Sequence, residues 1–293
     1  MAAVLNSNIA SLYASKNLQT AQSKMADSVE RLSSGLRINR AQDDAAGLGI
    51  ANALTSQINS ANQGIRNLND GISLVQTAEG AISAAQEMAQ RILTLAVQGS
   101  NGSLGLNERT AIQSEMNTLL TAMDLISTRT TFSGNSLLNA TVGVSSGTAK
   151  FTLQVGKDSS DKIELDQTAF KMVGKTTGQA TAVEALINDA DIVSVAAAAQ
   201  AKFRLVATSA GTLVENLSKQ RSLLGAYQNQ IEYTVSNVTD LSANLSAARS
   251  NVQDTDYASE TASLTKGQIL QQAATAMLAQ ANQMPNVILS LLK

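Results

Sequence analysis

The residues that could carry out acid–base or nucleophilic chemistry in this chain are few. Its 293 residues include no histidine, cysteine or tryptophan. This removes the usual ligands of zinc and iron–sulfur centres, the Ser-His-Asp triad and the cysteine nucleophile. One group of carboxylates remains in the middle of the chain: Asp158, Asp161, Glu164 and Asp166. A carboxylate-only active site is chemically open, but the same residues suit the solvated face of a hairpin. We therefore expect no enzyme, no cofactor and no metal.

Charge and hydropathy narrow the possible partners. The chain has 21 Lys and Arg against 23 Asp and Glu, a net charge of −2, so neither nucleic acid nor an anionic membrane is an expected partner. No apolar run reaches the roughly 18 residues of a membrane span. The first residues, MAAVLNSNIASLYASKN, have neither the basic segment nor the apolar stretch of a secretory signal peptide, and we expect none to be cleaved.

Two short segments, each about 40 residues from one end of the chain, concentrate charged and turn-forming residues. In SSGLRINRAQDDAAGLGI, Gly35 suits the left-handed end of one helix, and Asp43 or Asp44 suits the start of the next. In NVQDTDYASE, the aspartates can cap a further helix. The residues expected to connect two structural units are Gly35, Arg37, Asp43, Asp44, Asp254 and Asp256.

Long helices must position these segments, because apolar residues recur at alternating steps of three and four over most of the chain. The longest match spans residues 192–252, and only Gln220 and Thr234 interrupt it. Further matches span residues 54–96 and 112–126, and the Gly-rich QGSNGSLGLNE between them predicts a turn between antiparallel helices. Residues 54–96 carry two neighbouring apolar stripes, so that helix must touch more than one partner.

Apolar stripes also reach both ends of the chain, whereas chain ends usually fray. Each stripe alone is typical of an ordinary bundle core, but matched stripes at the two ends predict paired coiled-coil segments. The middle differs, because KFTLQV and KIELD alternate polar and apolar residues around the loop GKDSSD, which predicts a β-hairpin. TTFSGNSLLN predicts a turn with short extended flanks.

The expected fold is mainly α: a long antiparallel, coiled-coil-like helical bundle of paired N- and C-terminal segments with a small β-hairpin insert in the middle. The expected domains are an inner terminal domain (1–43 with 256–293), a long-helix domain (44–130 with 180–255) and a small β-rich insert (131–179).

Long motifs at both ends resemble bacterial flagellin. The N-terminal motifs are LNSNIASLYASKNL, ERLSSGLRINRAQDDAAGLGIA and LNDGISLVQTAEGAI; the C-terminal motifs are AARSNVQDTDYASE, QILQQAATAMLAQANQMP and the final LSLLK. The resemblance covers both ends of the chain and implies an inner domain of paired terminal helices, a long-helix domain around it and variable outer domains in the middle. Since the middle is short here, large outer domains are expected to be absent or minimal.

The resemblance implies a structural subunit that is exported unfolded through the flagellar type III pathway and polymerises outside the cell into the filament used for motility. It implies as partners further copies of the chain, an export chaperone, a cap protein and a hook-junction protein. In the terminal helices, the residues expected to contact other subunits are Leu5, Ile9, Leu12, Leu32, Leu270, Met277, Met284, Ile288 and Leu291.

A smaller patch also follows from the resemblance. Arg91, Leu95 and Glu115 match positions that the innate immune flagellin receptor reads in the family, although Leu95 lies on an apolar stripe that must pack in any case. Two alternatives to the filament subunit stay open. One is the hook–filament junction adaptor, which resembles flagellin at both ends; the other is an enzyme inserted in the variable region, for which residues 131–190 are short.

Overall fold

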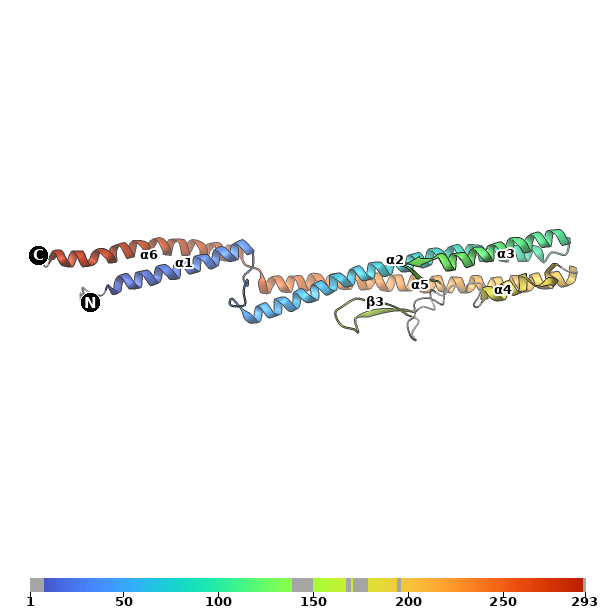
Figure 1. The fold of residues 1–293 in the computed structure, drawn as a ribbon, viewed down its shortest axis with the longest axis horizontal. Helices are drawn as coiled ribbons and strands as arrows, with labels where there is room; N and C mark the ends of the chain where they lie inside the picture. The colour runs from blue at the N-terminus through green and yellow to red at the C-terminus, as the bar shows by residue number, and fades with distance from the viewer. Residues whose placement is uncertain (1–7, 139–149, 167–169, 171–178, 194–195, 292–293) are drawn as a thin grey trace. The chain divides into compact units, whose positions relative to one another are not determined.

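The computed structural model describes residues 8–138, 150–166, 170, 179–193 and 196–291. Its elements, labelled in Figure 1, are α1 (Ile9–Ser34), α2 (Ala45–Gly99), α3 (Leu106–Arg129), β1 (Thr131–Phe132), β2 (Asn135–Ser136), β3 (Lys150–Gln154), β4 (Lys162–Asp166), α4 (Gln179–Ile187), η2 (Ala190–Val193), α5 (Ala196–Gln253) and α6 (Tyr257–Leu291). The protein is mainly α-helical with a small β insert, which confirms the predicted fold class.

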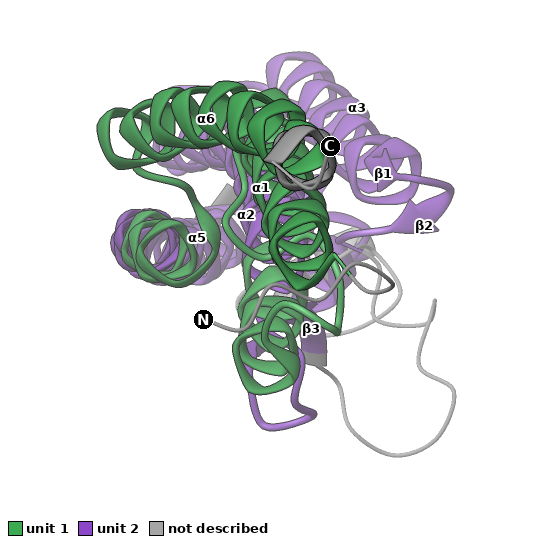
Figure 2. Ribbon diagram, turned by 90° about the vertical axis from the view of Figure 1, so that its left-hand side faces the viewer, with its two compact units in different colours: residues 1–58, 243–293 green, residues 59–242 purple. Residues whose placement is uncertain are grey.

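Residue contacts divide the chain into two compact units, and each combines segments that are far apart in sequence. Unit 1 comprises residues 1–58 and 243–293, and unit 2 comprises residues 59–242 (Figure 2). Both borders fall inside long helices, α2 and α5. The domain division expected from the sequence, with borders near residues 43 and 256, stays a prediction.

Unit 1 contains the antiparallel pair of α1 and α6. The side chain of Asn8 caps α1 by accepting a hydrogen bond from the N–H of Ser11 (3.1 Å). The same side chain reaches α6, where its Nδ2 donates to the carbonyl oxygen of Ala281 (2.8 Å). At the other end of α1, Arg31 lies 3.8 Å from Glu260 at the start of α6. The two ends of the chain therefore pair, as their matched stripes predicted.

Unit 2 is built around a buried cluster with side chains from α2, α3 and α5. Its α2 part carries the two predicted apolar stripes. Two polar residues that interrupt one of these stripes, Glu79 and Gln86, meet Arg221 of α5. The Glu79 carboxylate lies 3.6 Å from the Arg221 guanidinium, and the Gln86 Oε1 accepts from it at 3.1 Å. The interruptions in the apolar pattern are thus places where the two long helices exchange polar contacts.

The predicted hairpin is confirmed. Strands β3 and β4 are antiparallel, with Phe151 opposite Leu165 and Leu153 opposite Ile163. Its β3 strand lies against α2, where the Asn67 side chain donates to the carbonyl of Gln154 (2.8 Å). A second, very short hairpin joins β1 to β2, as TTFSGNSLLN predicted.

Two glycines of α2 make room for the larger hairpin. A Cβ at Gly64 would overlap the backbone carbonyl of Val155, and a Cβ at Gly71 would overlap the Leu153 side chain. Backbone cannot move aside as easily as a side-chain tip, so Gly64 is the tighter of the two positions. Glycine in a helix interior costs roughly 1 kcal/mol relative to alanine, and here the close approach of β3 explains its presence.

We expect Gly64→Ala to displace the β3–β4 hairpin from α2 and to lower the midpoint of urea unfolding. Gly80→Ala, in the same helix, is the matched control: a Cβ there meets no atom within 4 Å, so the change should leave stability equal or raise it by up to about 1 kcal/mol. Hydrogen exchange of residues 150–166 should rise only in Gly64→Ala. Equal unfolding midpoints and equal exchange in both variants would contradict this docking contact.

The short elements α4 and η2 lie outside the sequence-based expectations. Helix α4 packs by Val183 and Ile187 into the core of unit 2. Its last carbonyl, that of Ile187, accepts a hydrogen bond from Gln113 of α3 (2.6 Å). An apolar run this short does not distinguish a helix from a strand, which is why periodicity alone missed it.

Candidate assembly interface

Small side chains line the seam between α1 and α6. The buried seam positions of α1 are Ala14, Ala21 and Ser28, and those of α6 are Gly267, Ala274 and Ala281. In each helix these residues are seven apart, the repeat of a coiled coil, which keeps them on one line facing the partner. Small residues at a helix contact let the two backbones approach closely.

Larger apolar residues of the same two helices lie on the surface of unit 1. Leu12 is 73% exposed and Met277 is 62% exposed, and Ile9 and Leu270 are exposed as well. We call Ile9, Leu12, Leu270 and Met277 the outward face. Of the other residues expected to contact a second subunit, Leu32 is half-buried. Leu5 and the side chains of Met284, Ile288 and Leu291 lie outside the described part of the chain.

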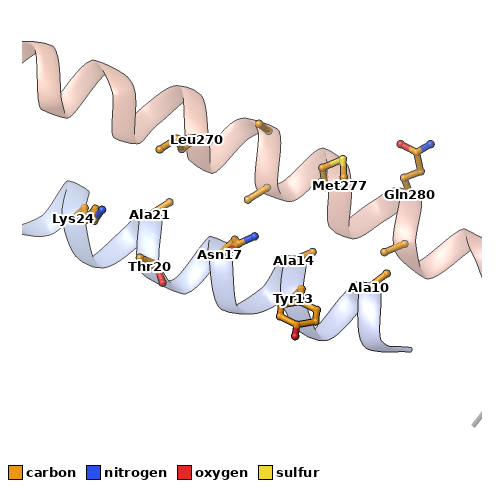
Figure 3. Close-up of a pocket in the computed structure, with 13 residues that line it drawn as sticks. Ala10, Tyr13, Ala14, Asn17, Thr20, Ala21, Lys24, Leu270, Met277 and Gln280 are labelled. Carbon is orange, nitrogen blue, oxygen red and sulfur yellow. The ribbon is translucent and has the colours of Figure 1, made fainter. Parts of the chain in front are cut away.

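A groove runs between α1 and α6 beside the seam. It has a volume of about 710 Å³ and takes its apolar lining from the two helices, including Ala14 and Ala21 of α1 and Leu270 and Met277 of α6. Figure 3 shows Ala10, Ala14 and Ala21 projecting from α1 toward α6. Alanine side chains are too short to fill this space, so the groove offers apolar surface to a further apolar group.

The predicted connection segments come together within unit 1. Gly35 ends α1 in the left-handed conformation (φ 72°), and its N–H donates to the carbonyl of Arg31 (2.9 Å). Leu36 forms an isolated antiparallel bridge with Asp254. Arg37 reaches the end of α5, where its side chain donates to the carbonyl of Val252 (2.6 Å).

The aspartates of these segments have two structural roles, helix capping and loop closure. Asp44 is the helix cap, since its Oδ1 accepts from the N–H of Gly47 (2.8 Å). Asp256 caps α6 in the same manner through the N–H of Ala258 (2.9 Å). Asp43 instead closes the loop, and its Oδ2 accepts from the N–H groups of Arg40 (2.8 Å) and Asn39 (3.0 Å).

The loop closure at Asp43 depends on its charge. The hydrogen bonds from the backbone of Arg40 and of Asn39 hold the pKa of the Asp43 carboxyl below its ordinary value. A carboxyl with a lowered folded-state pKa stabilises the fold above its unfolded pKa and loses that contribution as the pH falls through the folded pKa. The loop is therefore fully held at neutral pH.

Two family models match the helical parts of the chain. Residues 5–142 match the bacterial flagellin N-terminal helical region, and residues 207–292 match the bacterial flagellin C-terminal helical region. The chain belongs to the bacterial flagellin family. The paired ends of unit 1 are thus the terminal helices of a flagellin.

Full-length relatives agree with this assignment. This flagellin is 34% identical to flagellin B of Vibrio cholerae over 381 aligned positions, which cover all of both chains. It is 37% identical to the flagellin of Bacillus subtilis over 304 positions, or 99% of each chain. It is 38% identical to the flagellin of Halalkalibacterium halodurans over 290 positions, covering 99% of this chain and all of the relative. The alignment with the Vibrio protein is longer than this chain, so that relative carries segments this flagellin lacks.

Among solved structures, one described provisionally as a flagellar hook-associated protein from Vibrio parahaemolyticus has a TM-score of 0.55. It covers 72% of this flagellin, and all of its own chain is covered, at 13% identity. At that identity the likeness shows the fold alone. Across the described residues of this flagellin, no helix is long and apolar enough to cross a membrane.

The structure brings together two of the three residues of the predicted receptor patch on the surface. The Arg91 guanidinium on α2 and the Glu115 carboxylate on α3 form a partly exposed ion pair, with Nη2 and Oε1 2.7 Å apart. Leu95 instead lies in the core of unit 2 and is 2% exposed. A receptor patch on this flagellin stays a prediction, and Arg91 and Glu115 are the members that a partner could touch directly.

The mid-chain carboxylates occupy structural positions in the hairpin. The Asp161 side chain accepts from the N–H of Asp158 (3.3 Å) within the loop. Glu164 pairs with Lys162 at 2.9 Å. The N–H of Asp166 donates to the hydroxyl of Tyr227 on α5 (3.2 Å), which ties the hairpin to the long helix.

Apolar periodicity found only part of the small-residue seam. The C-terminal stripe included Ala274 and Ala281, whereas the N-terminal stripe followed larger residues such as Leu12 and left out Ala14, Ala21 and Ser28. A sequence signal for the seam does exist, namely Ala, Ala and Ser at positions 14, 21 and 28 and Gly, Ala and Ala at positions 267, 274 and 281. A repeat of small residues every seven positions on both terminal segments predicts a closely spaced helix pair.

Proposed function

We propose that this flagellin is the structural subunit of the bacterial flagellar filament and that the outward face of α1 and α6 forms contacts between its copies. One observation supports this interface. Alanine, glycine and serine form the contact between α1 and α6, while Leu12 and Met277 remain on the surface. Fully burying a leucine or methionine side chain contributes about 1.5–3 kcal/mol. Copies of the chain that cover these side chains would supply that contribution.

A filament contact joins two different surfaces, so it does not close on itself and can repeat without limit. Two unlike surfaces of this kind are present in the terminal pair: the exposed side chains of Ile9 and Leu12 on α1, and the groove between α1 and α6, which is lined in part by alanine. The hook–filament junction adaptor is less well supported, because the curated relatives are named flagellin or flagellar filament core protein.

The family resemblance also supports finer proposals. Export by the flagellar type III pathway, binding of an export chaperone and growth under a cap protein follow from it. Recognition by the innate immune flagellin receptor would use Arg91 and Glu115, and binding of the receptor ectodomain to Arg91→Ala tests that patch. As a member of a structural family, the protein is proposed to have no enzymatic activity.

We expect Met277→Asp to prevent polymerisation without unfolding the subunit. An unpaired carboxylate buried between copies costs at least about 3 kcal/mol, or about a hundredfold in the critical concentration for assembly. The substitution should leave the subunit stable, because Met277 is already exposed in it. Sedimentation and electron microscopy measure assembly, and urea unfolding measures the subunit.

Met277→Leu is the matched control, since it keeps volume and apolar character. It should polymerise at the concentration that the unchanged protein requires. Filaments of normal length from Met277→Asp would show that this face of α6 is not between copies. Formation of micrometre filaments by the unchanged protein would distinguish a filament subunit from a junction adaptor.

A further inference from the structure

Asn101 and Gly102 form the only Asn-Gly pair in the 293-residue sequence. They lie in the turn between α2 and α3, outside the bounds of both helices. In such a pair the backbone nitrogen of the second residue can attack the side-chain carboxamide of the first, because glycine has no side chain to obstruct the approach. Whether the attack occurs in the folded protein depends on exposure and on what the two groups already bind.

The turn leaves both reacting groups accessible. The Asn101 side chain is exposed, and its Oδ1 accepts from the N–H of Ser103 (3.2 Å). This hydrogen bond folds the carboxamide over the backbone at Gly102, as in an Asx-turn, and draws electron density from the carbonyl carbon that must be attacked. Within the described residues, the N–H of Gly102 donates to no protein acceptor.

Neighbouring hydrogen bonds hold the turn around this free N–H. The N–H of Asn101 donates to the carbonyl of Gln98 (3.1 Å), and the N–H of Leu104 donates to the carbonyl of Asn101 (3.5 Å).

An asparagine inside a helix lacks a free N–H after it. Asn59, followed by Ser60, is also exposed on α2, but the N–H of Ser60 belongs to the helical hydrogen-bond ladder and is both bonded and turned away.

We infer that Asn101 is a site of spontaneous, non-enzymatic deamidation in the folded protein. The Gly102 nitrogen loses its proton and bonds to Asn101 Cγ, and ammonia leaves with the former side-chain nitrogen. The product is a five-membered succinimide ring. Water then opens the ring at either carbonyl, which yields aspartate or isoaspartate at position 101. One water is consumed and one ammonia released, with no oxidation or reduction.

Deamidation would change the turn in two ways. Either product adds one negative charge to a chain whose net charge is −2. The aspartate product keeps an acceptor for the N–H of Ser103, whereas isoaspartate routes the backbone through the former side chain and lengthens the turn by one carbon. The inference does not depend on the filament role, since it concerns a chemical property of the subunit.

The test follows the intact chain during incubation in mildly alkaline buffer at body temperature. Peptide mapping by mass spectrometry detects the gain of about 1 Da at each asparagine, and isoaspartyl methyltransferase labelling detects isoaspartate. Asn101 should convert while Asn59 stays unchanged, and isoaspartate should appear together with aspartate. In urea, Asn59 should begin to convert because its helix is lost.

Gly102→Ala is the principal variant. A Cβ at this position meets the tip of the flexible Gln200 side chain, which can move, so the variant should fold. It should slow conversion of Asn101 by roughly tenfold or more, because the methyl group hinders the approach of the nitrogen. Asn101→Gln should abolish the labelling at this turn. An unchanged mass at Asn101, conversion to aspartate without isoaspartate, or equal rates at Asn101 and Asn59 in the folded chain would overturn the inference.

Discussion

Leu95→Asp is expected to unfold unit 2. Leu95 is 2% exposed and belongs to the cluster that α2, α3 and α5 share. The change removes a buried leucine, which costs about 2–5 kcal/mol for truncations of this kind, and adds an unpaired buried carboxylate. The free energy of unfolding of an ordinary domain is about 5–15 kcal/mol. The destabilisation by this substitution is therefore comparable to the whole stability of the unit. Circular dichroism in a urea series should show a large fall in the unfolding midpoint.

Val97→Asp is the matched control for this change. Val97 lies two residues further along α2 and is 58% exposed, so the same new charge stays in water. Its unfolding midpoint should remain close to that of the unchanged protein. If both variants unfolded alike, helix propensity or charge rather than burial would be the cause, and a stable Leu95→Asp subunit would contradict the placement of Leu95 in the core.

The second large effect is expected in limited proteolysis of subunit and filament side by side. In the subunit, α1 and α6 bury mainly alanine, glycine and serine against each other, so little apolar burial opposes the entropy of ordering about 75 residues. Both ends should be cut rapidly, leaving a core of about residues 45–255. In the filament, copies that cover the outward face should protect the ends.

The trimmed core supplies the control. It should retain the helical signal of unit 2, because the cluster of buried residues there is unaffected by the cut. It should no longer assemble into native filaments. Equal protection of the ends in subunit and filament, or full polymerisation by the trimmed core, would show that the terminal helices form an ordinary intramolecular bundle.

Most helices and both hairpins could be predicted from local pattern, because period and turn chemistry act over a few residues. The apolar pattern at residues 192–252 corresponds to α5, Ala196–Gln253. Gly35 ends α1 in the left-handed conformation that glycine favours. Helix α4 could not be predicted, since a run as short as QATAVEALI becomes helical through its packing against the core of unit 2. The choice between Asp43 and Asp44 as a cap also needed the loop geometry.

The sequence alone predicted that the two ends pair, because matched apolar repeats on both terminal segments are typical of paired coiled-coil helices. Only the tertiary structure decided which residues meet. The apolar stripes included Leu12 in the N-terminal segment and both Ala274 and Met277 in the C-terminal segment. Periodicity alone did not separate the residues that pack within the pair from those that remain outside it. Close approach of two helix backbones favours the smaller residues. For that reason Ala14, Ala21, Ala274 and Ala281 are buried in the seam, and Leu12 and Met277 remain on the surface.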